Sequence, residues 1–183
     1  MQATRGTPLS STDPAETRPS SSSRCRLLFV VVALTAYAVD VGTKLLAVAH
    51  LTPGEPKDVI GGLLRLDLVR NPGAAFSTGT SYTLILSVIA LLAAGVVIRF
   101  GRRLGDPTWA VALGLLLAGV CGNLTDRVFR EPGFLRGHVV DFLELPHWPV
   151  FNVADMLIDA AVLLIIIQTW RGIGISGVRH VRS

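Results

Sequence analysis

The chain has 183 residues, of which 50% are hydrophobic and only 16% are charged, and its mean hydropathy is +0.54. A soluble domain of this length rarely combines so little charge with so many aliphatic side chains. The net charge of +4 does not indicate a nucleic-acid partner, because the basic residues lie at the ends of apolar blocks rather than in one aromatic-lined patch. The composition therefore predicts an integral membrane protein.

Residues 1–23 are rich in Ser, Thr and Pro and carry almost no large apolar side chains. Such a composition cannot bury enough surface to offset the entropy of ordering, so a disordered cytoplasmic tail is predicted. The first apolar block, residues 27–49, has the length of a helical span. Its Ala36-Tyr37-Ala38 mimics a secretory cleavage site, but the apolar character continues well beyond it, which favours an uncleaved span.

Residues 50–81 form a mixed segment with several prolines and glycines. Within it Leu64, Leu66 and Leu68 alternate with Arg65 and Asp67, and this period of two predicts one or two short strands. We expect a small sheet that lies on the membrane surface.

Three more apolar blocks follow, and they predict spans at about residues 82–98, 108–125 and 152–170. The third and fourth are joined by a longer connection, residues 127–151, which contains three prolines and Asp141. The predicted class is an all-α membrane protein with one four-span domain, residues 24–170, and a basic tail, residues 171–183. No internal repeat is visible.

The arginines predict the orientation of the four spans. Ten lie in the N-terminal tail, in the loop between the second and third spans, and in the C-terminal tail. The two opposite loops hold basic residues that are offset by acidic ones: Lys57, Arg65, Arg70, Arg130 and Arg136 against Glu55, Asp58, Asp67, Glu131 and Glu144. The positive-inside rule therefore places both termini in the cytoplasm. Cys25 and Cys121 then lie near opposite membrane surfaces, too far apart to pair.

With this topology, and a helix rise of about 1.5 Å per residue, the membrane-edge polar residues all fall at the extracytoplasmic side. Asp40 and Lys44 are four residues apart, so they share a helical face and can neutralise each other. Asn123, Asp126 and Arg127 also share a face, and an Asp–Arg pair there is typical of a scaffold. A single shared site is the economical explanation.

Two carboxylates beside the last span, Asp141 and Asp155, are candidates for chemistry. An acid at the bilayer edge is costly to keep, and two neighbouring acids divide proton duties because both cannot ionise cheaply. The stretch Asn71-Pro72-Gly73-Ala74-Ala75-Phe76 is either a substrate-positioning loop or an ordinary turn before a helix. Together these residues favour an aspartic peptidase at the membrane edge.

Five ordered motifs resemble those of lipoprotein signal peptidase, the bacterial type II signal peptidase. They are Asp40-x-x-x-Lys44, Asn71-x-Gly73-Ala74-Ala75-Phe76, Gly122-Asn123-x-x-Asp126-Arg127, Val139-Val140-Asp141-Phe142 and Phe151-Asn152-x-Ala154-Asp155. The resemblance implies an inner-membrane aspartic endopeptidase that removes the signal peptide of diacylglyceryl-modified prolipoproteins before the lipidated Cys. It implies a catalytic pair, Asp141 and Asp155, without a metal or cofactor. The residues that would shape the pocket are Asp40, Lys44, Asn71, Gly73, Phe76, Asn123, Asp126, Arg127 and Asn152.

Two features depart from the family pattern. The polar N-terminal extension has no assigned role, and Asp159 places another acid one turn after Asp155. Asp159 either raises the pKa of Asp155 by repulsion or lies on another face with its own partner. His147, Trp148 and Trp170 are interpreted as interfacial or loop residues outside the site.

Three alternatives belong to other classes. A proton-coupled transporter would place its acids at mid-depth between repeated halves. A metal-dependent hydrolase would use Asp141, Asp155 and His138, whose spacing is not a zinc motif. A structural subunit gives no reason for polar clusters at one depth. The expected partners of the peptidase are lipid-modified prolipoproteins and membrane lipids, and the expected state is a monomer.

Overall fold

The computed structural model describes residues 21–73 and 80–179. It has four long helices, α1 (Ser21–His50), α2 (Thr80–Gly101), α3 (Pro107–Phe129) and α4 (Val153–Trp170). All four are long and apolar enough to cross a membrane, which confirms the predicted four-span class. Residues 1–20 of the predicted tail lie outside the described residues, and Ser21–Ser23 belong to α1.

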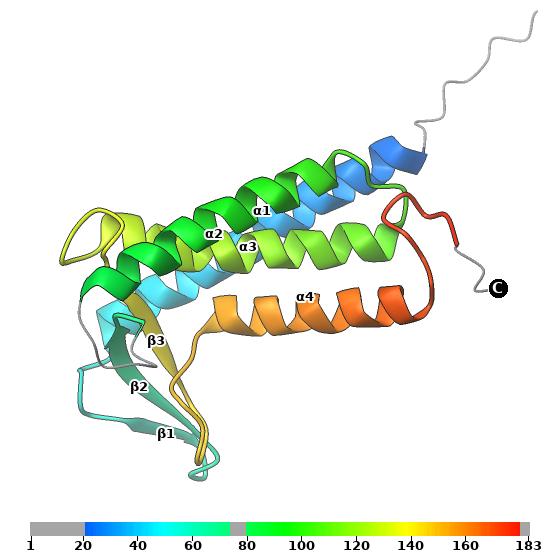
Figure 1. Ribbon diagram of the computed structural model, residues 1–183. Coiled ribbons are helices and arrows are strands. Elements are labelled where there is room, and N and C mark those ends of the chain that lie inside the picture. Colours follow the sequence, from blue (N-terminus) through cyan, green and yellow to red (C-terminus); the bar gives the residue numbers. More distant parts are fainter. Residues whose placement is uncertain (1–20, 74–79, 180–183) are drawn as a thin grey trace, which may run out of the picture.

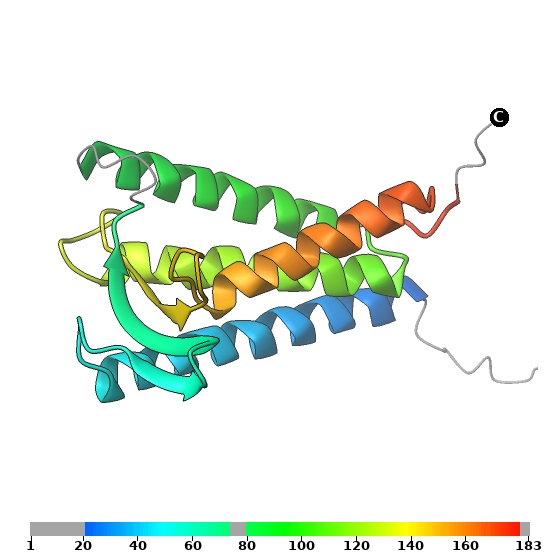
Figure 2. The ribbon, with the colours of Figure 1, turned by 90° about the horizontal axis from the view of Figure 1, so that it is seen from below.

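Helix α3 lies in the middle of the bundle and packs against the other three helices (Figures 1 and 2). Two glycines of α3 permit this close packing. A Cβ on Gly119 would lie 2.5 Å from the carbonyl oxygen of Ala154 in α4, and a Cβ on Gly122 would lie 2.2 Å from Oδ2 of Asp40 in α1. Only a residue without a side chain lets the three helices approach this closely.

The outer faces of the helices are apolar. Leu27 and Leu34 of α1, Leu92 of α2 and Leu163 of α4 are each more than half exposed. Because a helix pairs its own backbone groups, such a surface is stable in hydrocarbon. The side chains that are buried between the helices include many small and polar ones, so the polar residues collect inside the bundle.

Three strands form an antiparallel sheet in the order β1 (Lys57–Ile60), β2 (Leu64–Asn71) and β3 (Val139–Glu144). The strands predicted between the first two spans are present as β1 and β2. Strand β3 was not predicted, because the connection before α4 was interpreted as a loop. Its β-branched Val139 and Val140 favour a strand, and Asp141 pairs with Val69 of β2.

The sheet lies at one end of the bundle, and the first residues of α1 and the last residues of α4 lie at the other (Figure 1). At that other end the chain after α4 folds back on the α2–α3 loop, where the N–H of Gly105 donates to the carbonyl of Ile175 over 2.9 Å. The indole of Trp109 donates to the carbonyl of Ile173 over 2.8 Å. The two ends of the bundle are therefore built differently.

Candidate active site

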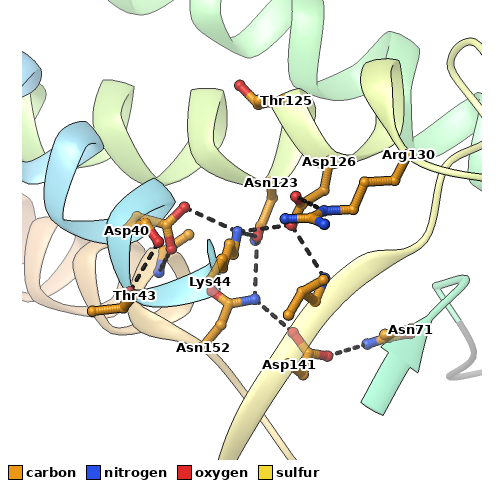
Figure 3. A network of polar contacts seen from close by, with 12 residues as sticks. Asp40, Thr43, Lys44, Asn71, Asn123, Thr125, Asp126, Arg130, Asp141 and Asn152 are labelled. Atoms are coloured by element: carbon orange, nitrogen blue, oxygen red, sulfur yellow. Dashed lines mark hydrogen bonds and ion pairs between the residues drawn. The ribbon is translucent and has the colours of Figure 1, made fainter. Parts of the chain in front are cut away.

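A group of polar side chains lies at the end of the bundle that carries the sheet (Figure 3). They come from five elements: Asp40 and Lys44 from α1, Asn71 from β2, Asn123, Asp126 and Arg127 from α3, Asp141 from β3, and Asn152 and Asp155 from the start of α4. Residues that are far apart in the sequence thus meet in one network, as the single-site hypothesis expects.

Asp141 is buried, with 2% of its surface exposed, and each of its carboxylate oxygens accepts a hydrogen bond. The Nδ2 amide of Asn71 donates to Oδ2 over 2.8 Å, and Nδ2 of Asn152 donates to Oδ1 over 2.5 Å. Strand pairing between β2 and β3 brings Asn71 and Val139 into register and so positions the first of these donors.

Asp155 lies in the first turn of α4, where Asn152 is the N-cap residue. The backbone N–H of Asn152 donates to Oδ2 of Asp155 over 3.1 Å. The Nδ2 amide of Asn123 donates to Oδ1 over 2.9 Å. Because Asn152 contacts both Asp155 and Asp141, it ties the two carboxylates together.

Lys44 is the buried cation of the network, with 1% of its surface exposed. Its ammonium lies 2.9 Å from Oδ2 of Asp40 and 3.2 Å from Oδ2 of Asp126. It also donates to Oδ1 of Asn123 over 2.9 Å. The predicted Asp40–Lys44 pair is therefore present, and it extends to a second acid. Buried charges in such a setting need several partners to offset desolvation.

Asp40 also stabilises the start of α4. Its Oδ1 accepts a hydrogen bond from the backbone N–H of Ala154 over 2.8 Å. The first N–H groups of a helix have no partner within the helix, and a carboxylate there interacts favourably with the positive end of the helix dipole. This contact joins α1 to the turn that carries Asp155.

The expected partner of Asp126 was Arg127, and this expectation was wrong. Arg130, one turn later in α3, makes the ion pair with Asp126. Residues four apart on a helix share a face, whereas neighbours point in different directions. Asp126 also accepts the backbone N–H of Val140 over 3.1 Å. It therefore fixes β3 against α3, as a scaffold residue would.

Arg127 is instead directed towards the turn after β2. Its Nη1 would lie 3.9 Å from a Cβ on Gly73. Nη1 is buried and has no hydrogen-bond partner among the described residues. The carbonyl of Arg127 accepts the N–H of Gly137 over 2.9 Å, which holds the connection to β3. The guanidinium thus keeps one donor that the described chain does not use.

The turn after β2 is an Asx turn. Oδ1 of Asn71 accepts the N–H of Gly73 over 2.8 Å, while the other end of the same amide binds Asp141. Gly73 has a φ of 95°, a backbone conformation that side chains disfavour. Phe76, the remaining predicted pocket residue of this motif, lies outside the described residues.

Asp141 and Asp155 line one cavity of about 440 Å³ between the sheet and the start of α4. Its walls also include Asn71, Trp148 and Asp159. Trp148, which was interpreted as an interfacial or loop residue, lies in the connection between β3 and α4 and lines this cavity. Asp159 lines the cavity too, and no hydrogen bond or ion pair joins it to a separate partner among the described residues.

Burial raises the pKa of Asp141 from 3.8 to about 6. The hydrogen bonds from Asn71 and Asn152 act in the opposite direction, and the nearby charge of Asp155 again raises the pKa. Burial is the largest cause, so Asp141 holds its proton to a higher pH than an ordinary carboxyl. Among residues 21–73 and 80–179, no group of three His, Cys, Asp or Glu side chains is arranged to hold a metal ion.

This fold and site define a multi-pass membrane protein with buried acids in a cavity at one end of its bundle. The model of the family described as signal peptidase (SPase) II matches residues 32–171. The chain therefore belongs to the signal peptidase II family, a family of peptidases. This membership replaces the transporter and structural-subunit alternatives.

Similar proteins agree with this assignment. Relatives named lipoprotein signal peptidase include one from Rhodococcus jostii, 46% identical over 91% of this chain and 85% of its own length. Another, from Mycobacterium avium, is 50% identical over 88% of this chain and 87% of its own length. A solved structure described as a bacterial membrane enzyme is 28% identical and superposes with a TM-score of 0.70, covering 77% of this chain and 91% of the solved one.

Proposed function

We propose that the protein is an aspartic endopeptidase of the bacterial inner membrane. It removes the signal peptide from diacylglyceryl-modified prolipoproteins and cuts before the lipidated Cys. Family membership supports the peptidase class. The observation that carries the aspartic mechanism is that Asp141 and Asp155 come from separate elements, line one cavity and are bridged by Asn152.

In this mechanism one carboxyl is ionised and the other is protonated. The ionised carboxylate takes a proton from a water held between the two acids, and that water attacks the scissile carbonyl. The protonated carboxyl donates to the carbonyl oxygen as the tetrahedral intermediate forms. The raised pKa favours Asp141 as the acid.

The other polar residues hold this arrangement. Asn71, Asn123 and Asn152 direct their amide donors at the two carboxylates. Lys44 neutralises Asp40 and Asp126, which fix α4 and β3 respectively. Arg127 retains a donor for a substrate carbonyl.

The arginine distribution supports an orientation with both termini in the cytoplasm and the cavity at the extracytoplasmic side. A substrate anchored by its acyl chains and by its own signal helix would reach such a site by lateral movement in the bilayer. The membrane then supplies both orientation and local concentration. We propose that the protein acts as a monomer.

The test is a gel-shift assay of a diacylglyceryl-modified precursor with purified protein in proteoliposomes. Asp141→Asn and Asp155→Asn should each lower turnover by at least about a thousandfold, within the range of general acid–base catalysis. Both variants should accumulate normally in the membrane. Processing of the precursor at the rate of the unaltered protein by either variant would refute the assignment of the pair.

A further inference from the structure

Asp159 is an acid of the fourth span that the mechanism above does not use. It lies in α4 one helical turn after Asp155 and lines the same cavity as both proposed catalytic acids. Its side chain is exposed. Among the residues that the structure describes, none donates a hydrogen bond to its carboxylate or forms an ion pair with it.

An unpaired acid in a membrane span is unusual. Acids within spans are costly and are almost always paired with another group or directed towards a functional cavity. The cations of the network form no ion pair with Asp159: Lys44 is held by Asp40 and Asp126, and Arg127 lies beside Gly73. The carboxylate of Asp159 is therefore open to a partner that enters the cavity.

The position of Asp159 indicates which part of a substrate it meets. It lies four positions after Asp155 in the helix, which is about 6 Å along the axis and away from the end of α4 that carries the sheet. If the proposed function holds, this direction leads from the scissile bond into the bilayer. The signal peptide leaves the catalytic acids in the same direction.

A substrate in this cavity presents backbone donors. A peptide must leave its helical conformation to expose a scissile carbonyl, and its N–H groups then lose their partners where little water is available to replace them. The cavity walls also include Met156 and Trp148, whose side chains supply at most the weak acceptor of a thioether. An unpaired carboxylate is an acceptor for such N–H groups.

We propose that Asp159 is a substrate-binding residue that accepts a hydrogen bond from the main-chain N–H of the signal peptide just before the scissile bond. This inference rests on the proposed function and extends it to the substrate backbone. It assigns to Asp159 a role in positioning the unwound segment, independent of the side chains that the segment carries.

The experiment pairs enzyme variants with altered precursors. Asp159→Leu removes the acceptor, and a precursor with an ester in place of the amide bond just before the scissile bond removes the donor. Each change alone should lower kcat/KM by about tenfold, the size of one hydrogen bond to a charged group. Together they should lower it no further, because both remove the same contact. Asp159→Asn keeps an acceptor oxygen and should lose about threefold.

Leu163→Ala is the matched control, since Leu163 is an exposed residue of α4 that does not line the cavity, and it should keep full activity. If the unaltered protein cuts the precursor but Asp159→Leu cuts it equally well, this inference fails and the proposed function stands. Losses that multiply in the combined experiment also overturn it. If the unaltered protein leaves the precursor intact, the proposed function fails and this inference fails with it.

Discussion

Asn152 and Asp155 hold each other by two reciprocal hydrogen bonds. The side-chain oxygen of Asn152 accepts the backbone N–H of Asp155 over 3.1 Å, and the Asp155 carboxylate accepts the backbone N–H of Asn152 over 3.1 Å. This capping box starts α4 and at the same time orients one of the two acids. The amide of Asn152 then reaches the other acid, Asp141.

The two roles of Asn152 can be separated. Asn152→Ala removes both the cap and the amide donors, so it should lower the free energy of unfolding by about 1 kcal/mol and kcat by at least about tenfold. Asn152→Ser keeps a capping oxygen but no amide. It should retain near-normal thermal stability in detergent and still lose activity as Asn152→Ala does. Equal activity of Asn152→Ser and the unaltered protein would contradict the proposed contact between Asn152 and Asp141.

Lys44 should be required for stability more than for chemistry. Lys44→Met leaves Asp40 buried without its cation, while Asp126 keeps Arg130, and the free energy of unfolding should fall by about 3–5 kcal/mol. The double variant with Asp40→Asn removes the uncompensated charge and should regain part of the loss. Thermal unfolding in detergent measures both, and a double variant less stable than Lys44→Met would show that the charge on Asp40 is not the cause.

Gly122 tests the close approach of α1 to α3. Gly122→Ala places a Cβ 2.2 Å from Oδ2 of Asp40, so Asp40 must move and its contact with α4 weakens. We expect a loss of about 1–3 kcal/mol in stability, as for overpacking, with reduced turnover. The matched control is Gly95→Ala in α2, where a Cβ would meet nothing within 4 Å. That variant should be as stable as the unaltered protein or slightly more so.

The pH dependence of cleavage should reflect Asp141. If Asp141 is the acid, kcat/KM falls as the pH rises through about 6, because the free enzyme loses this proton. The hydrogen bond from Asn71 favours the ionised form and lowers the pKa of Asp141. Asn71→Ala should therefore move the alkaline limb to higher pH, besides lowering the maximum rate. A pH–rate profile measures both, and a limb that stays in place or moves to lower pH would contradict this role of Asn71.

The titration of Asp141 should also make the free energy of unfolding depend on pH, in a direction that its raised pKa determines. The pKa of Asp141 is about 6 in the folded protein and 3.8 as its ordinary value, so the folded state binds more protons between these pH values. Stability is therefore greater below pH 4 and is lost as the pH rises to about 6, by up to about 3 kcal/mol from this group. Asp141→Asn lacks this contribution. The difference in Tm between the two proteins should shift in favour of Asp141→Asn from pH 4 to pH 7.

The sequence predicts the helices well because apolar blocks near the thickness of a bilayer have few alternatives. It also predicts the Asp40–Lys44 pair, since that contact depends only on helix geometry. Strand β3 was missed because a short apolar run between prolines does not distinguish a strand from a loop. Its strand character depends on pairing with β2, which is distant in the chain.

The residues that line the cavity were harder to predict from the sequence than the two acids, Asp141 and Asp155. Trp148 lines the cavity because the connection between β3 and α4 turns back towards α4. His147 beside it has a φ of 60°, and no residue pattern in the sequence predicts this conformation. The pairing of Asp126 with Arg130 in place of Arg127 follows from helix geometry and was available from the sequence. Such details depend on the path of a loop or on the choice between two neighbouring arginines.

The position of the capping box at residues 152–155 has a consequence for biosynthesis. A nascent chain that has threaded α1 to α3 into the bilayer already carries Asp141, but it has neither Asp155 nor the amide that joins the two acids. The site is complete only when the last span leaves the ribosome. If Asp141 and Asp155 are the catalytic pair, as we propose, a polypeptide truncated before that point would be inert, and peptidase activity would begin only when the membrane domain is complete.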